Sequence, residues 1–323
     1  MKVNKIKEKE IIDIICTNFS TKKNVVVGAG KDDCAVIDLG KWYLIITTDM
    51  LHKKADFPDR MNPYQIGWMT VACNLSDIAS MGATPFSFVV AIGIPDDTDT
   101  DFLKWLGEGM EACTSKYGVS IVGGDVDRHD ELTLVGTAIG KVDKSRLVRR
   151  EGAKVGDLLC VTGNLGSAQA GLRIALGKNS ALKTLKTSKN VEEILLGALF
   201  EPEPRVREGI ELSKFATSMT DISDSLATSA HDIASQGKTG FNILEKQIPI
   251  IDEVKSISKN KKDLRELFLY GGGDFELLFT INPEDLDVAS KKISFSVIGK
   301  AVSNGVYLDD PKEKVDFRGY RHF

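Results

Sequence analysis

The sequence predicts an α+β protein of two domains. Its 323 residues are about twice the length of an average domain. Strand-like apolar runs occur in close pairs and alternate with amphipathic helical segments, which is typical of α+β folds. A basic stretch at 141–150 and the polar run 151–157 interrupt this pattern near mid-chain. We therefore predict an N-terminal domain at residues 1–148 and a C-terminal domain at 149–323.

In the N-terminal half, helical and strand-like periodicities follow one another. In chain order we expect a helix at 6–18, strands at 34–39 and 42–48 joined by a turn at Gly40-Lys41, a helix at 63–81, a strand at 86–92, a helix at 100–117, and strands at 119–122 and 132–139. The 63–81 segment is apolar almost all round, which predicts a helix that is buried on most sides.

The C-terminal half continues with mixed elements. We expect a strand at 158–162, a helix at 166–177, a surface loop at about 177–190, helices at 191–200 and 204–215, a strand ending at Asp221, a helix ending at Gly237, and further α/β units. The loop is assigned because this connector is rich in Lys, Ser and Asn and lacks apolar periodicity.

Composition excludes several classes of function. With 42 Lys+Arg and 46 Asp+Glu the net charge is −4, and no basic block suggests nucleic-acid binding. Charges interrupt the N-terminus and no apolar run is long enough for a bilayer, so we expect no membrane association. The five cysteines form no CxxC pair, which favours buried free thiols in the cytoplasm over zinc or disulfides.

Acidic residues recur at the ends of apolar segments and where a strand is followed by a helix. They follow glycine-rich turns, end buried strands or lie on the apolar helix: Asp32, Asp33, Asp49, Asp77, Asp125, Asp221, Asp224 and Asp274. On that helix, Asp77 shares a face with Thr70 and Asn74. Carboxylates near apolar segments need donors or cations. Hard divalent ions would neutralise several at once, and oxygen ligands favour magnesium, which commonly shares a nucleotide phosphate. This pattern indicates phosphoryl transfer or ATP-driven activation.

Each motif also has a structural explanation. Ser223 or Asp224 can be a helix N-cap, and Asp33 can be a turn residue. Only the repetition of one pattern at separate places favours a shared metal site.

The glycine-rich motifs are less specific. Gly28-Ala29-Gly30-Lys31 lacks the spacing of a P-loop and is rejected as one. The run 163–171 begins a helix after a strand, which suits either anion contact or close helix–strand packing. The sequence contains neither the HExxH motif of zinc hydrolases nor the GxSxG motif of serine hydrolases. The apolar neighbours of Cys34 indicate a buried residue. We therefore predict no covalent catalytic nucleophile.

The motifs together carry a family resemblance. The sequence resembles thiamine-monophosphate kinases, of the superfamily that includes aminoimidazole ribonucleotide synthetase, selenophosphate synthetase and a hydrogenase maturation protein. The matching segments run in order over nearly the whole chain: 30–36, 47–51, 74–83, 123–125, 150–157, 221–224, 272–277 and 319–323.

The resemblance implies a two-domain PurM-like fold. The N-terminal domain would supply half of a β-barrel that spans a homodimer, and the C-terminal domain would be an α/β sandwich. The implied activity is transfer of the ATP γ-phosphoryl group to thiamine monophosphate, with several Mg²⁺ ions and no phosphoenzyme. Position by position, the implied metal ligands are Asp33, Thr47, Thr48, Asp49, Asp77, Asp125, Asp221 and Asp224. The implied ATP contacts are Gly124, Asp125, Arg150 and Ser223, and the implied substrate contacts are Asp56 and Tyr320.

The chain departs from the family pattern mainly around the acceptor. Lys31 is inserted before the Asp pair, Asp56 replaces a common His, and Gly273 replaces an acidic residue. The metal-binding set is intact while the substrate-binding set is altered. Two other functions stay open: a related ATP-dependent enzyme with another small acceptor, and a non-catalytic nucleotide-binding protein. A reactive Cys in a flexible N-terminal loop, which selenophosphate synthesis would require, is missing from residues 1–27.

Overall fold

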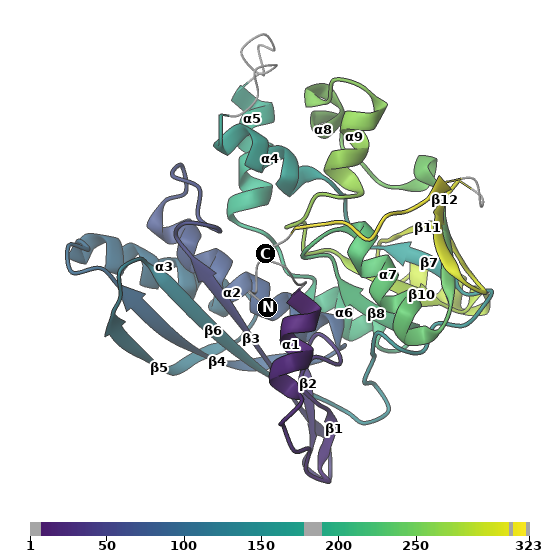
Figure 1. Cartoon of the computed structure of the whole chain (residues 1–323), viewed down its shortest axis with the longest axis horizontal. Helices are drawn as coiled ribbons and strands as arrows, with labels where there is room; N and C mark the ends of the chain where they lie inside the picture. Colours follow the sequence, from purple (N-terminus) through teal and green to yellow (C-terminus); the bar gives the residue numbers. More distant parts are fainter. Residues whose placement is uncertain (1–7, 178–188, 310–312, 321–323) are drawn as a thin grey trace.

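The N-terminal half is built on a six-stranded mixed sheet. The computed structural model describes residues 8–177, 189–309 and 313–320. The sheet has the order β1-β2-β3-β6-β4-β5 (Figure 1). Its strands are β1 (Val25–Val27), β2 (Ala35–Asp38), β3 (Tyr43–His52), β4 (Thr84–Ile94), β5 (Ser120–Arg128) and β6 (Thr133–Val142). All neighbours are antiparallel except β4 and β5, which are parallel.

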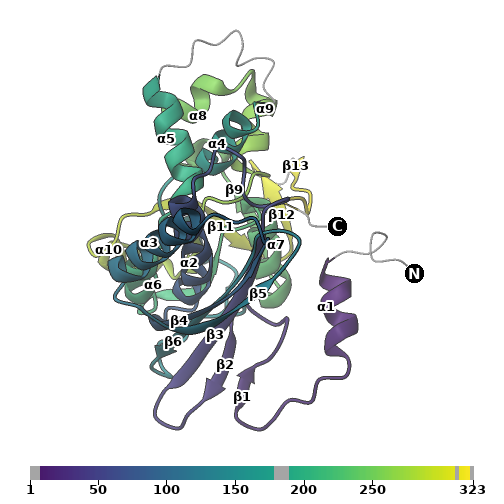
Figure 2. The same ribbon diagram turned by 90° about the vertical axis from the view of Figure 1, so that its left-hand side faces the viewer.

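Helix α2 (Pro63–Ser80) is the central helix of this half. Asn62 accepts from the Gln65 N–H at 2.9 Å, the Gln65 side chain accepts from the Asn62 N–H at 3.2 Å, and Pro63 occupies the first turn. Fourteen of its residues are buried, which confirms the predicted burial on most sides. Helices α2 and α3 (Thr100–Lys116) lie on one side of the sheet, and α1 (Glu8–Cys16) lies on the other (Figure 2).

The C-terminal half is built on a second mixed sheet of order β13-β12-β9-β11-β7-β10-β8. Its strands are β7 (Leu158–Val161), β8 (Ala216–Asp221), β9 (Gly240–Ile243), β10 (Leu277–Ile281), β11 (Ser296–Val302), β12 (Gly305–Leu308) and β13 (Glu313–Lys314). Its helices are α4 (Ser167–Ala175), α5 (Lys189–Phe200), α6 (Val206–Leu212), α7 (Leu226–Gly237), α8 (Asp252–Ile257), α9 (Lys261–Phe268) and α10 (Leu286–Ser290). The predicted α+β class with two domains is confirmed.

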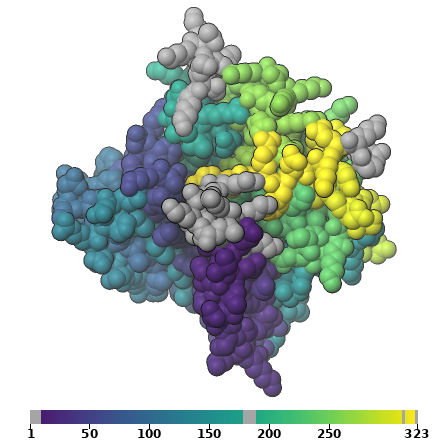
Figure 3. Space-filling model, in the orientation of Figure 1, coloured from purple at the N-terminus to yellow at the C-terminus, as the bar shows by residue number. Residues whose placement is uncertain are grey.

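One hydrophobic cluster spans both halves, and two further clusters lie within the C-terminal half. Met219 and Phe279 of the second sheet belong to the same buried cluster as Ala79 of α2. Close backbone contact strengthens this junction, because a Cβ on Gly209 of α6 would lie 2.2 Å from the Ala79 carbonyl oxygen. The space-filling view accordingly shows both halves as one continuous body (Figure 3). The C-terminal half of α2 is therefore fixed against α6 and β8.

We expect Gly209→Ala to destabilise the protein by about 2 kcal/mol, because the added methyl group overlaps backbone that cannot move alone. Urea or thermal denaturation measures this loss. Gly197→Ala in α5 is the matched control: no atom lies within 4 Å of its Cβ position, and Ala raises helix stability by about 0.5–1 kcal/mol there. Equal stabilities of the two variants would contradict the tight junction.

Several predicted boundaries were wrong. The strand expected at 119–122 continues to Arg128, so that Asp125 lies within β5 and not after it. Parallel pairing with β4 extends this strand through Gly124, where a Cβ would lie 1.9 Å from the Val90 carbonyl oxygen. In the same way β3 continues past Asp49 because β6 pairs with it. The helix expected at 204–215 is shorter and spans Val206–Leu212.

Four further expectations concern the loop, the domain boundary, the closed barrel and the absence of a membrane segment. Most of the predicted loop at 177–190 lies outside the described residues, and the boundary at 148/149 stays a prediction. The N-terminal sheet is open in the described part of the chain, with β1 and β5 at its edges. Among the described residues, no helix has the length and hydropathy needed to cross a membrane.

Candidate active site

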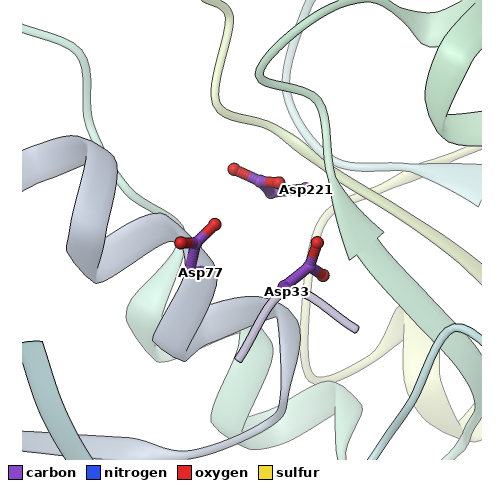
Figure 4. A group of neighbouring side chains, drawn as sticks. All are labelled: Asp33, Asp77 and Asp221. Atoms are coloured by element: carbon purple, nitrogen blue, oxygen red, sulfur yellow. The ribbon is translucent and has the colours of Figure 1, made fainter. Parts of the chain in front are cut away.

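Three aspartates from distant parts of the chain meet between the two sheets. Asp33 lies in the turn before β2, Asp77 lies on α2, and Asp221 ends β8. Each offers a carboxylate oxygen within 4.8 Å of the other two (Figure 4). The group thus joins both halves of the molecule, and we call it the Asp33–Asp77–Asp221 cluster. Its position follows from the packing of α2 against β8.

Neighbouring hydroxyl groups orient these three carboxylates. The Thr47 hydroxyl donates to Asp77 Oδ2 at 2.5 Å, and the Ser76 hydroxyl donates to Asp221 Oδ2 at 2.7 Å. The Ser80 hydroxyl donates to Asp33 Oδ2 at 2.6 Å. Each carboxylate is therefore held in one orientation through its Oδ2 atom.

Arg150 is the cation of the cluster among the described residues. Its guanidinium donates from Nε to Asp33 Oδ1 at 3.0 Å and makes a second, closer contact through Nη2. The Thr220 hydroxyl donates to the same oxygen at 3.1 Å. The positive charge of Arg150 thus compensates the negative charge of Asp33. In the hydrogen bonds described above, Asp77 and Asp221 accept only from hydroxyl groups, which carry no charge.

The charges of the cluster repel one another. Burial, and then the charges of Asp49, Asp221 and Asp33, raise the pKa of Asp77 well above its ordinary value. Burial, and then the charge of Asp33, raise the pKa of Asp221 to about 8. Such a group is stable near neutral pH only with protons or with added cations. Its oxygen-only donors fit a hard divalent cation such as Mg²⁺ or Ca²⁺.

Strand β3 divides its three predicted ligands between two faces. Thr47 contacts Asp77, and the Asp49 N–H donates to the Asn74 side chain at 3.1 Å, so both lie on the face covered by α2. Thr48 is exposed on the opposite face, where its hydroxyl donates to the Gly136 carbonyl oxygen at 2.7 Å. The alternation of side chains along a strand explains the division. Asn74 and Asp77 thus both contact β3, in keeping with their expected position on one face of the helix.

Comparisons with known proteins cover nearly all of the chain. Residues 31–142 match the family model of AIR synthase related proteins, N-terminal domain, and residues 154–309 match the C-terminal domain. The thiamine-monophosphate kinase of Methanospirillum hungatei is 41% identical over 92% of its length and 90% of this chain. That of Pyrococcus horikoshii is 37% identical over 97% of its length and 99% of this chain.

The chain belongs to the thiamine-monophosphate kinase family. A solved relative, AaThiL complexed with AMPPCP and TMP, superimposes with a TM-score of 0.88 at 27% identity and covers 100% of this chain and 99% of that one. Escherichia coli HypE, a hydrogenase maturation protein, shares the fold alone, with a TM-score of 0.69 at 17% identity and coverage of 97% and 98%. The PurM-like fold expected from the resemblance is confirmed.

Thr47 and Arg150 contact the Asp33–Asp77–Asp221 cluster directly, whereas most of the other residues that the family resemblance marks lie elsewhere. Gly124 and Asp125 lie on the exposed edge strand β5. The loop after β8 carries Ser223 and Asp224, and the Tyr320 N–H donates to the Asp224 carbonyl oxygen at 3.3 Å. This contact brings a predicted substrate residue beside a predicted metal ligand. Their roles in binding stay predictions.

Asp56, the second predicted substrate residue, lies in the loop after β3. Its Oδ2 accepts from the His52 N–H at 2.8 Å. In this kinase the carboxylate therefore has a local structural partner, and its contact with an acceptor stays a prediction.

Asp274 of the glycine-rich motif caps a helix. Its carboxylate accepts from the Gly166 N–H at 2.6 Å and from the Ala168 N–H at 3.0 Å, at the start of α4. Burial raises its pKa to about 7. Because the chain's own carboxylate occupies these amides, the glycine-rich run at 163–171 serves helix capping and close packing rather than anion contact.

Several functional neighbours were missed in the sequence. Ser76 and Ser80 flank Asp77 at positions i−1 and i+3, and this spacing is the signal that could have identified them as carboxylate donors. Thr220, one residue before Asp221, gave no such signal. Cys34 is buried as predicted, and burial raises its thiol pKa well above the ordinary value.

Proposed function

We propose that this chain is a magnesium-dependent thiamine-monophosphate kinase, which transfers the γ-phosphoryl group of ATP to thiamine monophosphate and yields thiamine diphosphate and ADP. The observation that carries the proposal is the Asp33–Asp77–Asp221 cluster, an oxygen-only cation site assembled by both halves in a chain of this family. The relative solved with AMPPCP, an ATP analogue, and TMP supports both substrates. The relatives at 41% and 37% identity are both thiamine-monophosphate kinases. This supports the kinase over a related enzyme with another acceptor and over a non-catalytic nucleotide-binding protein.

The chain's residues would act by positioning and charge. Magnesium, when bound, would neutralise phosphate oxygens that carry charge in the transition state. Asp33, Asp77 and Asp221 would hold it, with Asp49 beside them. The guanidinium of Arg150 would add a fixed positive charge at the nucleotide. No side chain needs to form a covalent bond, because phosphoryl transfer depends on alignment and electrostatic stabilisation.

A product assay tests this function. We expect thiamine diphosphate and ADP to form when the protein is incubated with ATP, MgCl₂ and thiamine monophosphate. Thiamine and an aminoimidazole ribonucleotide precursor serve as control acceptors and should give neither. ATP binding without turnover would favour a non-catalytic protein, and turnover with another acceptor would favour a different enzyme of the superfamily.

The second proposal is the homodimer with a shared barrel. On the N-terminal sheet, β3 exposes Met50 and the edge strand β5 exposes Val122 and Val126, each at more than 60%. An open apolar edge of this kind invites pairing with a second sheet. Sedimentation should give twice the chain mass of 35.3 kDa. A monomer at micromolar concentration would contradict it.

We place the activity in the cytoplasm, in keeping with five free cysteines.

Magnesium should stabilise the protein more at pH 8 than at pH 5. Burial and neighbouring charges raise the pKa of Asp77 well above its ordinary value and that of Asp221 to about 8. The contribution of these two groups to the stability of the metal-free protein is therefore fully present below their ordinary value of 3.8 and is lost as pH rises toward 8. Added cations offset the repulsion of the ionised cluster. The measurement is the Tm difference between MgCl₂ and EDTA at each pH. An equal difference at both pH values would contradict the role of the cluster.

A further inference from the structure

Asp32, the first residue of the Asp pair, turns away from the cluster. Its side chain is fully buried, at 0% exposure. Its Oδ1 accepts from the Asp33 N–H at 3.0 Å, and its Oδ2 accepts from the Arg150 N–H at 3.2 Å. The Nε atoms of Arg149 and Arg150 each lie 3.8 Å from this carboxylate. Asp32 therefore faces the backbone and the charges of two consecutive arginines.

These arginines lie in the connection between the two sheets. The connection leaves β6 at Val142 and enters β7 at Leu158. On its other side, the Arg149 carbonyl oxygen accepts from the Met219 N–H at 3.0 Å, and Met219 lies in β8, the strand that ends at Asp221. The connection is thus held from the N-terminal half by Asp32 and from the C-terminal half by β8.

The Asp pair consequently holds Arg150 at both ends. Asp32 accepts from its backbone N–H, and Asp33 accepts from its guanidinium. A free arginine side chain has many rotamers, so fixing its backbone and its tip together leaves one orientation, toward the cluster. Only a carboxylate in the place of Asp32 can accept two backbone N–H bonds and also balance two neighbouring guanidinium groups.

We propose that Asp32 is a positioning residue, which fixes the connection between the sheets so that Arg150 reaches Asp33 and the nucleotide. Asp32 acts through Arg150 and holds no metal. The proposal rests on the proposed function only for the nucleotide contact of Arg150. The hydrogen bond from the Arg150 N–H is a property of the fold itself.

The test is Asp32→Asn, which keeps the size but removes the charge and one acceptor. We expect the Kd of Mg·ATP, measured by calorimetry, to rise about tenfold, as for a hydrogen-bonded charge of roughly 1.4 kcal/mol. The KM for ATP should rise with it, while the KM for thiamine monophosphate stays within about twofold. Hydrogen exchange should show faster exchange of the Arg150 amide, which is measured without any nucleotide.

Two further variants make the result decisive. Glu151→Gln is the matched control: Glu151 is paired with the same Arg149 but is 51% exposed, and its loss should change neither Kd nor amide exchange. In an Arg150→Gln background, Asp32→Asn should add nothing to the Kd, because both act through one group. Additive effects, or a Kd within twofold of wild type in folded Asp32→Asn protein, would overturn the proposal. Failure of the wild type to bind ATP would instead refute the proposed function, and the exchange readout would still decide the role of Asp32.

Discussion

Asp77→Asn is expected to lower kcat by about 10³-fold while the protein stays folded. The substitution keeps the side-chain volume but removes one charge from the cation site, and the loss equals about 4 kcal/mol of transition-state stabilisation, similar to that of other preorganised electrostatic groups. The metal-free variant should be at least as stable as wild type, because its pKa indicates that the ionised Asp77 is unfavourable beside Asp49, Asp221 and Asp33.

Rate and stability are measured together in this experiment. Steady-state ADP release gives kcat, and thermal denaturation in EDTA gives the stability. Asp38→Asn is the control, because Asp38 lies in β2 near Asp33 but pairs with Lys144 at the surface, and its kcat should stay within about twofold of wild type. Turnover of Asp77→Asn within tenfold of wild type would refute its assignment as a metal ligand.

Glu276→Gln is expected to have the largest effect on stability, a loss of about 3 kcal/mol. Glu276 is 4% exposed and accepts from Arg205 at 2.6 and 2.5 Å and from the Thr162 hydroxyl at 2.7 Å. The substitution removes the closer counter-charge of Arg205, whose side chain is 27% exposed, and leaves Glu208 at 3.9 Å as the more distant partner. Breaking a buried ion pair typically costs about 3–5 kcal/mol, and the exposure of Arg205 places this variant at the lower end. Gly163 adjoins this carboxylate so closely that a Cβ there would lie 1.8 Å from Glu276 Oε1.

The surface of the same molecule offers a matched comparison. Glu266 also receives two bonds from an arginine, at 2.9 and 2.8 Å from Arg318, but these side chains are 33% and 44% exposed. Glu266→Gln should therefore cost about 1 kcal/mol or less. Urea denaturation of both variants measures the difference. Similar losses in the two would show that burial does not govern the Glu276 pair.

Local sequence patterns predicted the features that depend only on residues close together in the chain. The all-round apolar pattern of residues 63–81 predicted a buried helix because a helix with no polar face must be surrounded. The alternation of side chains along a strand also implies that Thr47 and Asp49 face one way and Thr48 the other. The family resemblance, which carries no information about strand faces, implied all three as metal ligands.

Boundaries set by pairing with distant strands were harder to predict. Gly123-Gly124 looks like the end of a strand, yet β5 continues through it because β4 supplies a partner. Asp274 and Asp221 follow similar patterns in the sequence. One caps α4 and the other joins the Asp33–Asp77–Asp221 cluster, and only the fold distinguishes them.

The α+β class, the order of the motifs and the family were all predictable from the sequence, because they depend on residue type and on spacing along the chain. Which aspartates meet depends instead on the packing of elements that are distant in the chain. Asp32 and Asp33 are neighbours of the same type, but one faces the connection between the sheets and the other faces Asp77 and Asp221. The reason is that carboxylates repel one another, so no local preference draws them together, and only the burial of α2 against β8 brings these side chains into contact.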